Sequence, residues 1–334
     1  DGEHRLTAAI DLGMTEVPVV ALNVQEVDRR LLRQVMNKLK GVHDPLLDAE
    51  EFKFLLESQE IDFTQLLAQP EEDISQFIEK MIPTDIIEDE FDGELPKEPK
   101  SKLGEIYQLG NHRLMCGDST IKKDVDKLMD GKKADMVFTD PPFNVNYSYE
   151  NYEDNKTDEE YLSFVKEFYT QLKINTKKGG VIYIMSGNKY LLELGVLFKK
   201  HFRFSQILFW VKDNPTLGRS DYQYNYEAIL YGWNNGDTHK YYGKSVVPAA
   251  NLVDRERGKL KTIHKAQRPI KLVSDYIKNS SKINEIILDL FGGSGSTLIS
   301  SEQLDRVCYM MEIDPQYIDV IINRWESFTG EKAV

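Results

Sequence analysis

Two short segments carry residues whose types and spacing could do chemistry. The sequence TDPPF occupies residues 139–143, and the glycine-rich sequence LDLFGGSGST occupies residues 288–297. Each segment comes at the end of an apolar run with a strand pattern, residues 135–139 and 285–290. Open α/β folds bind their ligands where parallel strands end. One segment suits an amino group and the other a nucleoside cofactor, so together they predict an enzyme that transfers a group from such a cofactor to an amine.

The glycine-rich segment has the features of a nucleoside-binding turn. Its glycines allow a tight turn and a close approach of backbone N–H groups to a ligand. Glu312 ends the next predicted strand, 19 positions after Gly293, where a carboxylate can accept both hydroxyls of a ribose. Asp289 would repel a pyrophosphate but suits a cationic amino group, which favours S-adenosylmethionine over NAD. Taken alone, the turn also fits a purely structural use.

The sequence around Asp140 suits an exocyclic amino group. Asp140 supplies a carboxylate acceptor, Pro141 and Pro142 supply carbonyls without competing N–H groups, and Phe143 supplies a flat face for stacking. The lone pair of a nucleobase amino nitrogen is delocalised into the ring. Two acceptors that draw its hydrogens can turn that lone pair toward an electrophilic methyl group, which requires positioning and no metal. The alternative is a proline-rich turn after a buried strand.

Strands and helices alternate from residue 103 onward, which predicts a mostly parallel sheet with helices on both faces. Helical spacing falls between many of the strand candidates. The seven candidate strands are residues 112–116, 135–139, 180–185, 205–211, 227–232, 285–290 and 307–313.

The net charge of −13 is unevenly distributed along the chain. Residues 1–100 hold 10 basic and 24 acidic residues, whereas residues 101–334 hold 32 and 31. Residues 234–271 carry nine basic against three acidic residues, which predicts contact with a phosphate backbone. A solvated loop is the alternative.

Other sequence features limit the class of protein. No apolar run reaches the ~20 residues of a membrane-spanning helix. The sequence does not open on a basic start followed by an apolar core, so we expect no secretory signal in it. Cys116 and Cys308 predict buried, reduced thiols without a disulfide or a metal site. We expect a cytoplasmic protein. We also expect a chain that begins inside a longer one, because its first residue is Asp.

The two motifs in this order, with the basic stretch between them, resemble the DNA amino-methyltransferases of the circularly permuted β group. The resemblance covers about residues 103–325. It implies an α/β, Rossmann-like S-adenosylmethionine-dependent methyltransferase fold with a seven-stranded, mostly parallel sheet over residues 103–334. It also implies a prokaryotic or phage-encoded protein, double-stranded DNA as the partner, and a target base that is flipped out. An Asp in the first motif position is more common among adenine-N6 enzymes, and cytosine-N4 methylation is left open.

The resemblance assigns roles to individual positions. The catalytic motif would be Asp140, Pro141, Pro142 and Phe143. Asp118 would contact the adenine of the cofactor, Asp289 its amino group and Glu312 its ribose. All the cofactor-binding positions are Asp118, Gln267, Pro269, Asp289, Phe291, Gly293, Gly295, Thr297 and Glu312. The predicted DNA-binding residues, in and beside a target-recognition region of about residues 211–265, are Arg219, Lys259, Lys261, Lys265 and Arg268.

One stretch departs from the family pattern. The family often has a His-Pro-Thr sequence before the helix that covers the methionine end of the cofactor, and this chain has TIHKAQ at residues 262–267. The departure leaves the individual contacts of Gln267 and Pro269 open.

The N-terminal part differs in character from the rest. Residues 1–82 have helical spacing, at 28–40 and 47–56, and the sequence GEHR at residues 2–5 resembles the core motif of ParB-like domains. We expect a partial ParB-like domain, because the strands that precede this motif in that family are missing. Residues 83–102 are acidic, contain three prolines and predict a linker.

The sequence is compatible with several other functions. A DNA-binding ParB-like regulator with an inert methyltransferase domain is an alternative of another class, and a small-molecule or RNA methyltransferase is a third. An NAD enzyme would leave residues 140–143 without a role. A homodimer is left open.

Overall fold

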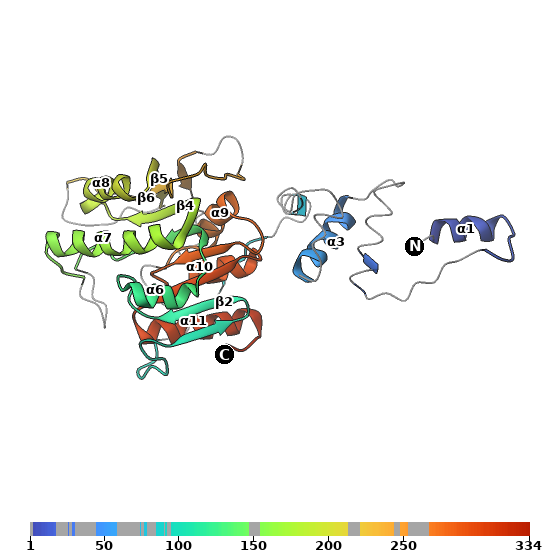
Figure 1. Ribbon diagram of the computed structural model, residues 1–334, viewed down its shortest axis with the longest axis horizontal. Coiled ribbons are helices and arrows are strands. Elements are labelled where there is room, and N and C mark those ends of the chain that lie inside the picture. The colour runs from blue at the N-terminus through green and yellow to red at the C-terminus, as the bar shows by residue number, and fades with distance from the viewer. Residues whose placement is uncertain are drawn as a thin grey trace. The chain divides into compact units, whose positions relative to one another are not determined.

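The structure is a computed structural model that divides the chain into two compact units, residues Asp1–Thr84 and Asp85–Val334 (Figure 1). The first unit contains helices α1 (Glu3–Asp11) and α3 (Pro45–Ser58), and α3 confirms the helical pattern predicted for residues 47–56. Most of the pattern at residues 28–40 lies outside the described residues. The structure describes residues 3–17, 26, 29–30, 45–58, 74, 77–78, 85–89, 91, 95–146, 154–212, 221–243, 248–252 and 267–334.

In the part of the second unit that the structure describes, nine strands form one sheet in the order β1-β2-β9-β8-β3-β4-β6-β5-β7. All seven predicted strands are present. The predicted number was too low because β1 and β7, at the two ends of this order, are only four and three residues long and give no readable alternation. The strands are β1 (Ile106–Leu109), β2 (His112–Cys116), β3 (Ala134–Thr139), β4 (Thr176–Ser186), β5 (Arg203–Val211), β6 (Tyr226–Trp233), β7 (Ala250–Leu252), β8 (Ile286–Asp289) and β9 (Val307–Glu312).

The prediction of a mostly parallel sheet is confirmed. Strands β2, β9, β8, β3 and β4 pair in parallel, one after the other. Strand β6 is antiparallel to both β4 and β5, and β1 is antiparallel to β2. The five parallel strands therefore end at the same edge of the sheet, where the predicted site residues lie.

Helices cover both faces of the sheet (Figure 1). Val137 of β3 packs in a core with helices α6 (Lys122–Met129), α7 (Asp158–Asn175) and α8 (Leu191–His201). Its neighbours Met136 and Phe138 point to the opposite face and pack with α9 (Ile270–Ser280), as the period of a strand requires. Helices α10 (Ser296–Gln303) and α11 (Pro315–Thr329) close a third core.

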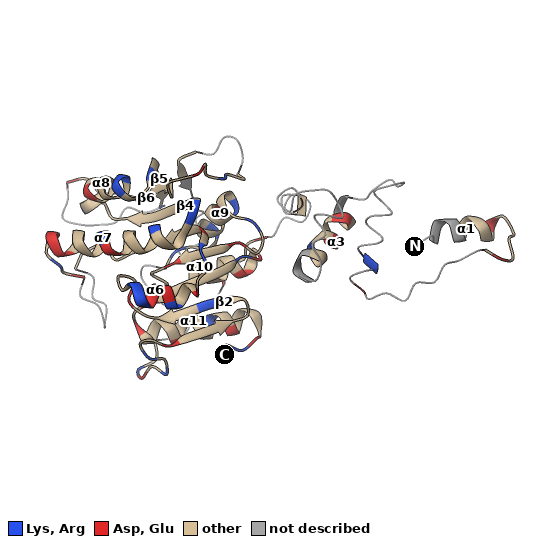
Figure 2. Cartoon of the chain, viewed as in Figure 1, with Lys and Arg blue, Asp and Glu red and all other residues tan. Residues whose placement is uncertain are grey.

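Charged residues fix the beginning of α7, the longest of the described helices. The Thr157 hydroxyl accepts a hydrogen bond from the Glu160 N–H, and the Glu160 side chain accepts one from the Thr157 N–H. Three acidic residues lie in this first turn (Figure 2), where they face the positive end of the helix dipole. These contacts set the start of α7 at Asp158, directly after its N-cap Thr157.

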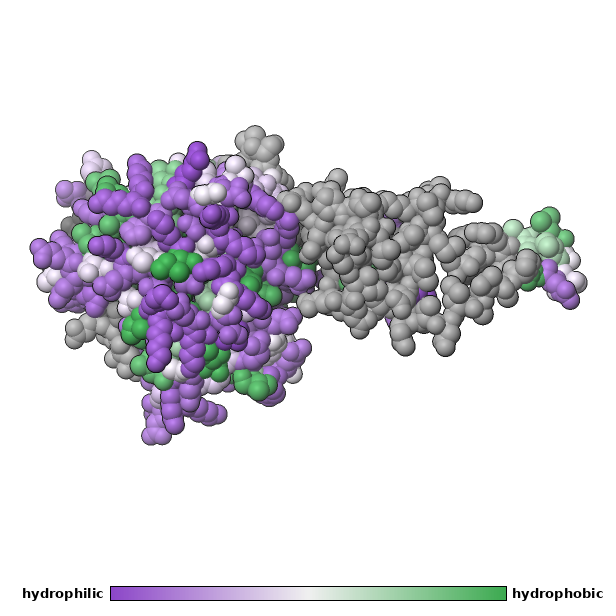
Figure 3. Space-filling view, viewed as in Figure 1, coloured by the Kyte–Doolittle hydropathy of each residue, from purple (hydrophilic) through white to green (hydrophobic). Residues whose placement is uncertain are grey.

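On the face of the second unit shown in Figure 3, hydrophobic residues form scattered spots among hydrophilic ones. None of the helices in the described ranges is long and apolar enough to cross a membrane. Within the same ranges there is no group of three or more His, Cys, Asp or Glu residues that could hold a metal ion. Cys116 and Cys308 are buried free thiols, as the sequence predicts.

Candidate cofactor and target-base site

Four parallel strand ends bring the predicted acidic residues together. Asp118 follows β2, Glu312 ends β9, Asp289 ends β8 and Asp140 follows β3. These four strands are consecutive neighbours in the sheet. The Thr139 hydroxyl donates to Oδ1 of Asp289 at 2.8 Å and so joins the ends of β3 and β8. The edge thus places the predicted cofactor residues beside the predicted catalytic motif.

Asp289 is a buried carboxylate that lacks a cationic partner among the described residues. Its side chain is 3 % exposed, and Oδ1 also accepts the Phe291 N–H at 3.0 Å. Burial raises the pKa of Asp289 to about 7, and the nearby negative charge of Asp140 adds to this. Hydrogen bonds from Thr297, Phe291 and Thr139 favour the ionised form only in part. A ligand ammonium group would stabilise the ionised form further.

Glu312 accepts hydrogen bonds from three backbone N–H groups, one of which belongs to the glycine turn. Its Oε2 accepts from Gly293 at 2.8 Å, and its Oε1 accepts from Ile313 at 2.9 Å and Asp314 at 3.0 Å. Burial raises the pKa of Glu312 to about 7. A carboxylate offers about four acceptor positions, so one position on Oε2 can accept from a ligand while the turn stays bound.

The glycine turn connects β8 to α10 and needs glycine for two different reasons. Gly293 and Gly295 have φ angles of 51° and 86°, a conformation that other residues rarely adopt. A Cβ built on Gly293 would meet no atom within 4 Å, so the turn faces open space there. A Cβ on Gly292 would lie 2.8 Å from Met310 Sδ. Gly292 was missing from the sequence prediction, and its role is to pack closely against β9.

Phe291 and Thr297 support the turn from behind. The Phe291 ring packs edge-on against Phe164 and Phe168 of α7, with ring centroids 5.8 Å and 5.0 Å away. Thr297 is buried in α10, and its hydroxyl contact favours the ionised form of Asp289.

Asp118 accepts the N–H and the hydroxyl of Thr120 on its Oδ1 at 2.8 Å and 2.6 Å.

Gln267 and Pro269 lie beside the glycine turn. The Ser296 hydroxyl donates to the Arg268 carbonyl at 2.8 Å, which ties residues 267–269 to the start of α10. The Gln267 Oε1 is buried and has no hydrogen-bond partner among the described residues. This acceptor, the open side of Gly293 and the buried Asp289 carboxylate fit a polar nucleoside cofactor that carries an amino group.

The DPPF segment leaves β3 with a partly accessible carboxylate. The Asp140 side chain is 22 % exposed. Burial raises its pKa to about 6, the Arg268 guanidinium opposes this rise, and Glu227 adds to it. The Pro142 carbonyl already accepts the Tyr161 hydroxyl at 2.9 Å. A Cβ on Gly187, which follows β4, would lie 3.0 Å from the Cβ of Phe143, so this glycine makes room for the ring.

Arg268 lies between two carboxylates and does not face the solvent. Its Nε is 2.8 Å from Asp140 Oδ2, and its Nη2 is 2.7 Å from Glu227 Oε2. The side chain is 9 % exposed, and the guanidinium lies 5.9 Å from the centre of the Phe143 ring. The sequence predicted that Arg268 contacts a DNA phosphate, and such a contact needs an accessible cation. Arg268 lies just before the first turn of α9, and this position directs its side chain into the site.

Two groups that hold the motif were missed by sequence reasoning. Glu227, at the start of β6, pairs with Arg268 and also with Lys212. An acidic residue in an otherwise apolar strand was the available signal. Asn144, with a φ of 54°, donates through its amide to the Tyr190 hydroxyl at 2.9 Å, and its N–H binds Asp154 at 2.8 Å. Nothing in residue spacing indicates this second cluster.

Arg219, Lys259, Lys261 and Lys265 lie outside the described residues, as do residues 213–220 and 253–266 of the predicted target-recognition region.

Comparison with known proteins gives a consistent class. A family of DNA methylases, the N6 and N4 methyltransferases, matches residues 134–324. The type II methyltransferase M2.MboI of Moraxella bovis is 25 % identical over 226 residues, which cover 58 % of this chain and 81 % of the relative. The type II methyltransferase M.HpaI of Haemophilus parainfluenzae is 25 % identical over 253 residues, which cover 67 % of this chain and 77 % of the relative.

A solved structure shows the same fold. The PvuII DNA methyltransferase, which is cytosine-N4-specific, superposes with a TM-score of 0.54 at 17 % identity and covers 66 % of this chain and 89 % of its own. The fold and the family match define an S-adenosyl-L-methionine-dependent methyltransferase. The chain belongs to the family of DNA methylases that modify adenine N6 or cytosine N4.

Proposed function

We propose that this chain methylates adenine N6 in double-stranded DNA after flipping the base into the site beside residues 140–143. The observation that carries the proposal is the hydrogen bond from Thr139 to Asp289, because it joins the strand that presents Asp140 to the strand that presents the cofactor turn. The Asp at position 140 supports adenine over cytosine. Cytosine N4 is the second candidate, because the PvuII enzyme of similar fold acts there.

The cofactor residues divide by chemistry. S-adenosyl-L-methionine supplies an electrophilic methyl group when it is bound. Asp289 would bind its amino group, Glu312 would accept from its ribose through Oε2, and Asp118 would contact its adenine. Gln267 and Pro269 would cover the methionine end, where the Gln267 Oε1 is an available buried acceptor. The turn at Gly293 and Gly295 would let the nucleoside approach the backbone.

The catalytic motif would act through hydrogen bonds. The Asp140 carboxylate and the Pro141 carbonyl would accept the two hydrogens of the amino group, since the Pro142 carbonyl already binds Tyr161. The Phe143 ring would stack on the flipped base. Transfer leaves a positive charge on the nitrogen, and Asp140, whose pKa burial raises to about 6, can take the proton that the product amine releases.

Arg268 and Glu227 would position Asp140. The guanidinium contacts both Asp140 oxygens, at 2.8 Å and 3.1 Å, and so fixes the plane of the carboxylate. Its positive charge favours the ionised form, which is the stronger acceptor. Arg268 acts in this proposal on Asp140 and not on DNA phosphates.

DNA contacts would come from the basic stretch. Arg219, Lys259, Lys261 and Lys265 remain our proposed phosphate or base contacts, within a target-recognition region of about residues 211–265. The domain division at residues 1–82, 83–102 and 103–334 and the ParB-like character of the first part likewise stay predictions, as does a homodimer.

The division of roles can be tested with two substitutions. Asp140→Ala removes an amine acceptor outside the proposed cofactor contacts, so we expect transfer to fall by about 100-fold or more while the dissociation constant for S-adenosylmethionine stays unchanged in calorimetry. Asp289→Asn should weaken cofactor binding by about 10-fold or more, because a charge-assisted bond is lost. Loss of cofactor affinity in Asp140→Ala, or unchanged affinity in Asp289→Asn, would refute the assignment.

A further inference from the structure

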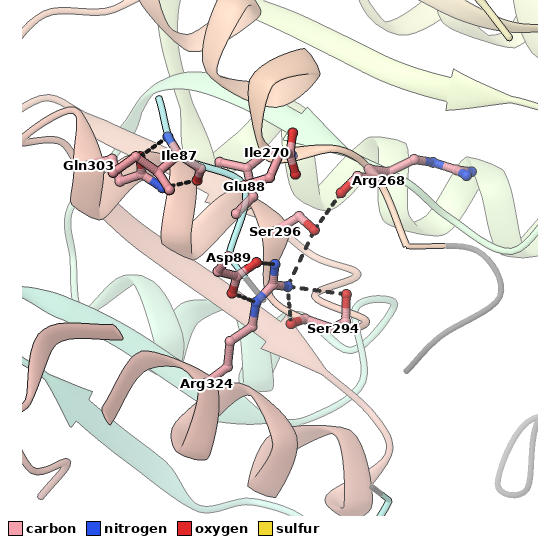
Figure 4. A network of polar contacts seen from close by, with 9 residues as sticks. All are labelled: Ile87, Glu88, Asp89, Arg268, Ile270, Ser294, Ser296, Gln303 and Arg324. Atoms are coloured by element: carbon pink, nitrogen blue, oxygen red, sulfur yellow. Dashed lines mark hydrogen bonds and ion pairs between the residues drawn. The ribbon is translucent and has the colours of Figure 1, made fainter. Parts of the chain in front are cut away.

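Residues Ile86–Asp89, here called the strap, contact the three helices α9, α10 and α11 that adjoin the proposed cofactor site. The Ile87 N–H donates to Gln303 Oε1 at 2.9 Å, and the Gln303 amide donates back to the Ile87 carbonyl at 2.9 Å (Figure 4). Ile86 packs against two of the hydrophobic cores. The strap, which lies in the segment predicted to be a linker, is therefore bound to the end of α10.

Glu88 caps helix α9. Its Oε2 accepts the Ile270 N–H at 2.9 Å, and its Oε1 accepts the Lys271 N–H at 2.9 Å. The local N-cap residue is Pro269, which makes no side-chain cap. A carboxylate at this position satisfies N–H groups that lack a partner within the helix and complements the helix dipole. Glu88 thus holds the helix end directly after Gln267 and Pro269.

Asp89 holds the glycine turn through Arg324. Its oxygens bind Arg324 Nε at 2.5 Å and Nη2 at 2.6 Å, a two-pronged pair (Figure 4). Arg324 is 1 % exposed, and its remaining nitrogen Nη1 donates to the Ser294 carbonyl at 2.7 Å. The position of Ser294, between Gly293 and Gly295, is therefore set by a side chain that Asp89 orients.

The same network continues toward the target-base site. Arg324 Nη1 lies 3.4 Å from the Ser296 hydroxyl, which donates to the Arg268 carbonyl at 2.8 Å (Figure 4). The Arg268 side chain in turn contacts Asp140. A continuous set of hydrogen bonds therefore runs from the strap, through the glycine turn, to the catalytic motif.

We infer that the strap is a positioning element of the methyltransferase site, with Glu88 and Asp89 as positioning residues for cofactor binding. This inference rests on the proposed function, because it assumes that the glycine turn and residues 267–269 hold S-adenosylmethionine. The physical reason is that Arg324 is buried and its other contacts are neutral oxygens of Ser294 and Ser296. Without Asp89, its geometry and that of the turn are no longer fixed.

Two variants test the strap in the full chain, Glu88→Gln and Asp89→Asn. We expect each to raise the dissociation constant for S-adenosylmethionine by about 10-fold, the effect of a small displacement of binding groups. Calorimetry measures this constant, and a melting temperature is recorded for each variant. Glu88→Gln leaves no buried cation without a partner, so it provides a folded variant even where Asp89→Asn is strongly destabilised.

Two matched controls separate positioning from stability. Asp85→Asn removes an exposed carboxylate next to the strap and should change neither quantity. Asp319→Asn removes a buried carboxylate on α11 that accepts the Lys100 and Ser101 N–H groups at 2.6 Å and 3.1 Å. It should lower the melting temperature while the cofactor dissociation constant stays within about 2-fold, because it touches neither the turn nor α9.

The outcomes separate a failure of the proposed function from a failure of the strap inference. If the unaltered chain does not bind S-adenosylmethionine, the proposed function fails and the strap inference fails with it. If the unaltered chain binds and both strap variants bind equally well, the strap only stabilises the fold and the inference alone is overturned. Weaker binding in the strap variants but not in Asp319→Asn supports it.

Discussion

Replacing Arg268 with Met should shift the pH dependence of methyl transfer. In the structure the guanidinium makes close contacts to Asp140 and Glu227, at 2.7 to 3.1 Å, from a side chain that is 9 % exposed. The pKa of Asp140 is about 6 with this cation in place. A methionine keeps much of the volume but removes the charge, so both carboxylates lose their shared partner.

The size of the shift follows from the removed charge. A neighbouring guanidinium lowers a carboxyl pKa by about 1 to 3 units, so its removal should raise the pKa of Asp140 to about 8 for a two-unit loss. About one quarter of Asp140 would then be ionised at pH 7.5, against nearly all of it in the unaltered chain. Single-turnover transfer should fall about 4-fold at pH 7.5 and recover at pH 9.

The assay is single-turnover transfer from labelled S-adenosylmethionine to duplex DNA between pH 5.5 and 9 at constant ionic strength. Arg268→Lys is the matched control, because it keeps a positive charge and should leave the midpoint close to that of the unaltered chain. An Arg268→Met profile with an unshifted midpoint would refute the role of Arg268 in ionising Asp140. Activity lost equally at every pH, with cofactor still bound, would instead place Arg268 in direct contact with the substrate.

Two further predictions concern the cofactor pocket and the base pocket. The pKa values of Asp289 and Glu312 are both raised to about 7, so the folded chain without ligand binds more protons than the unfolded chain between pH about 4 and 7. These two groups therefore increase the free energy of unfolding of the ligand-free chain as the pH falls through 7. S-adenosylmethionine, in contrast, requires ionised Asp289. Its binding should therefore weaken below pH about 7, by at most about 10-fold per pH unit for each group. Calorimetry at pH 8.0 and 6.0 measures this change in the dissociation constant. The Asp289→Asn variant should keep only the part of the pH dependence that is due to Glu312. A pH-independent dissociation constant in the unaltered chain would contradict the assignment. Gly187→Ala would place a Cβ 3.0 Å from the Cβ and 3.1 Å from the Cγ of Phe143, so the ring must move and the KM for DNA should rise by about 2- to 10-fold with cofactor affinity unchanged. An unaltered KM would show that the Phe143 ring does not contact the base.

The sequence predicted those parts of the fold that depend on local patterns. Seven strands could be found because each lies in a predicted run of five residues or more in the sequence. The turn at Gly293 could be found because its glycines and the later Glu312 have a known spacing. Strands β1 and β7 are too short to give a pattern. The placement of Asp289 next to Thr139 follows from the parallel sheet once β3 and β8 are neighbours.

Contacts between distant segments could not be predicted in the same way. Glu88 caps a helix that begins 182 positions later, and Asp89 binds Arg324, 235 positions away. Charge and proline content placed Glu88 and Asp89 in a predicted acidic linker. These two properties of a sequence carry no information about which distant residues the side chains contact. Arg268 was assigned to DNA for the same reason, since a basic residue in a basic stretch gives no sign that two carboxylates surround it.

Nucleoside mass spectrometry of duplex DNA, after incubation with the full chain and labelled S-adenosylmethionine, tests the central claim most directly. We expect labelled N6-methyladenine, and no label in DNA treated with Asp140→Ala. Labelled N4-methylcytosine would keep the chemistry of the site and overturn the choice of base. DNA without any label, from a chain that binds the cofactor, would contradict the claim that this site methylates DNA.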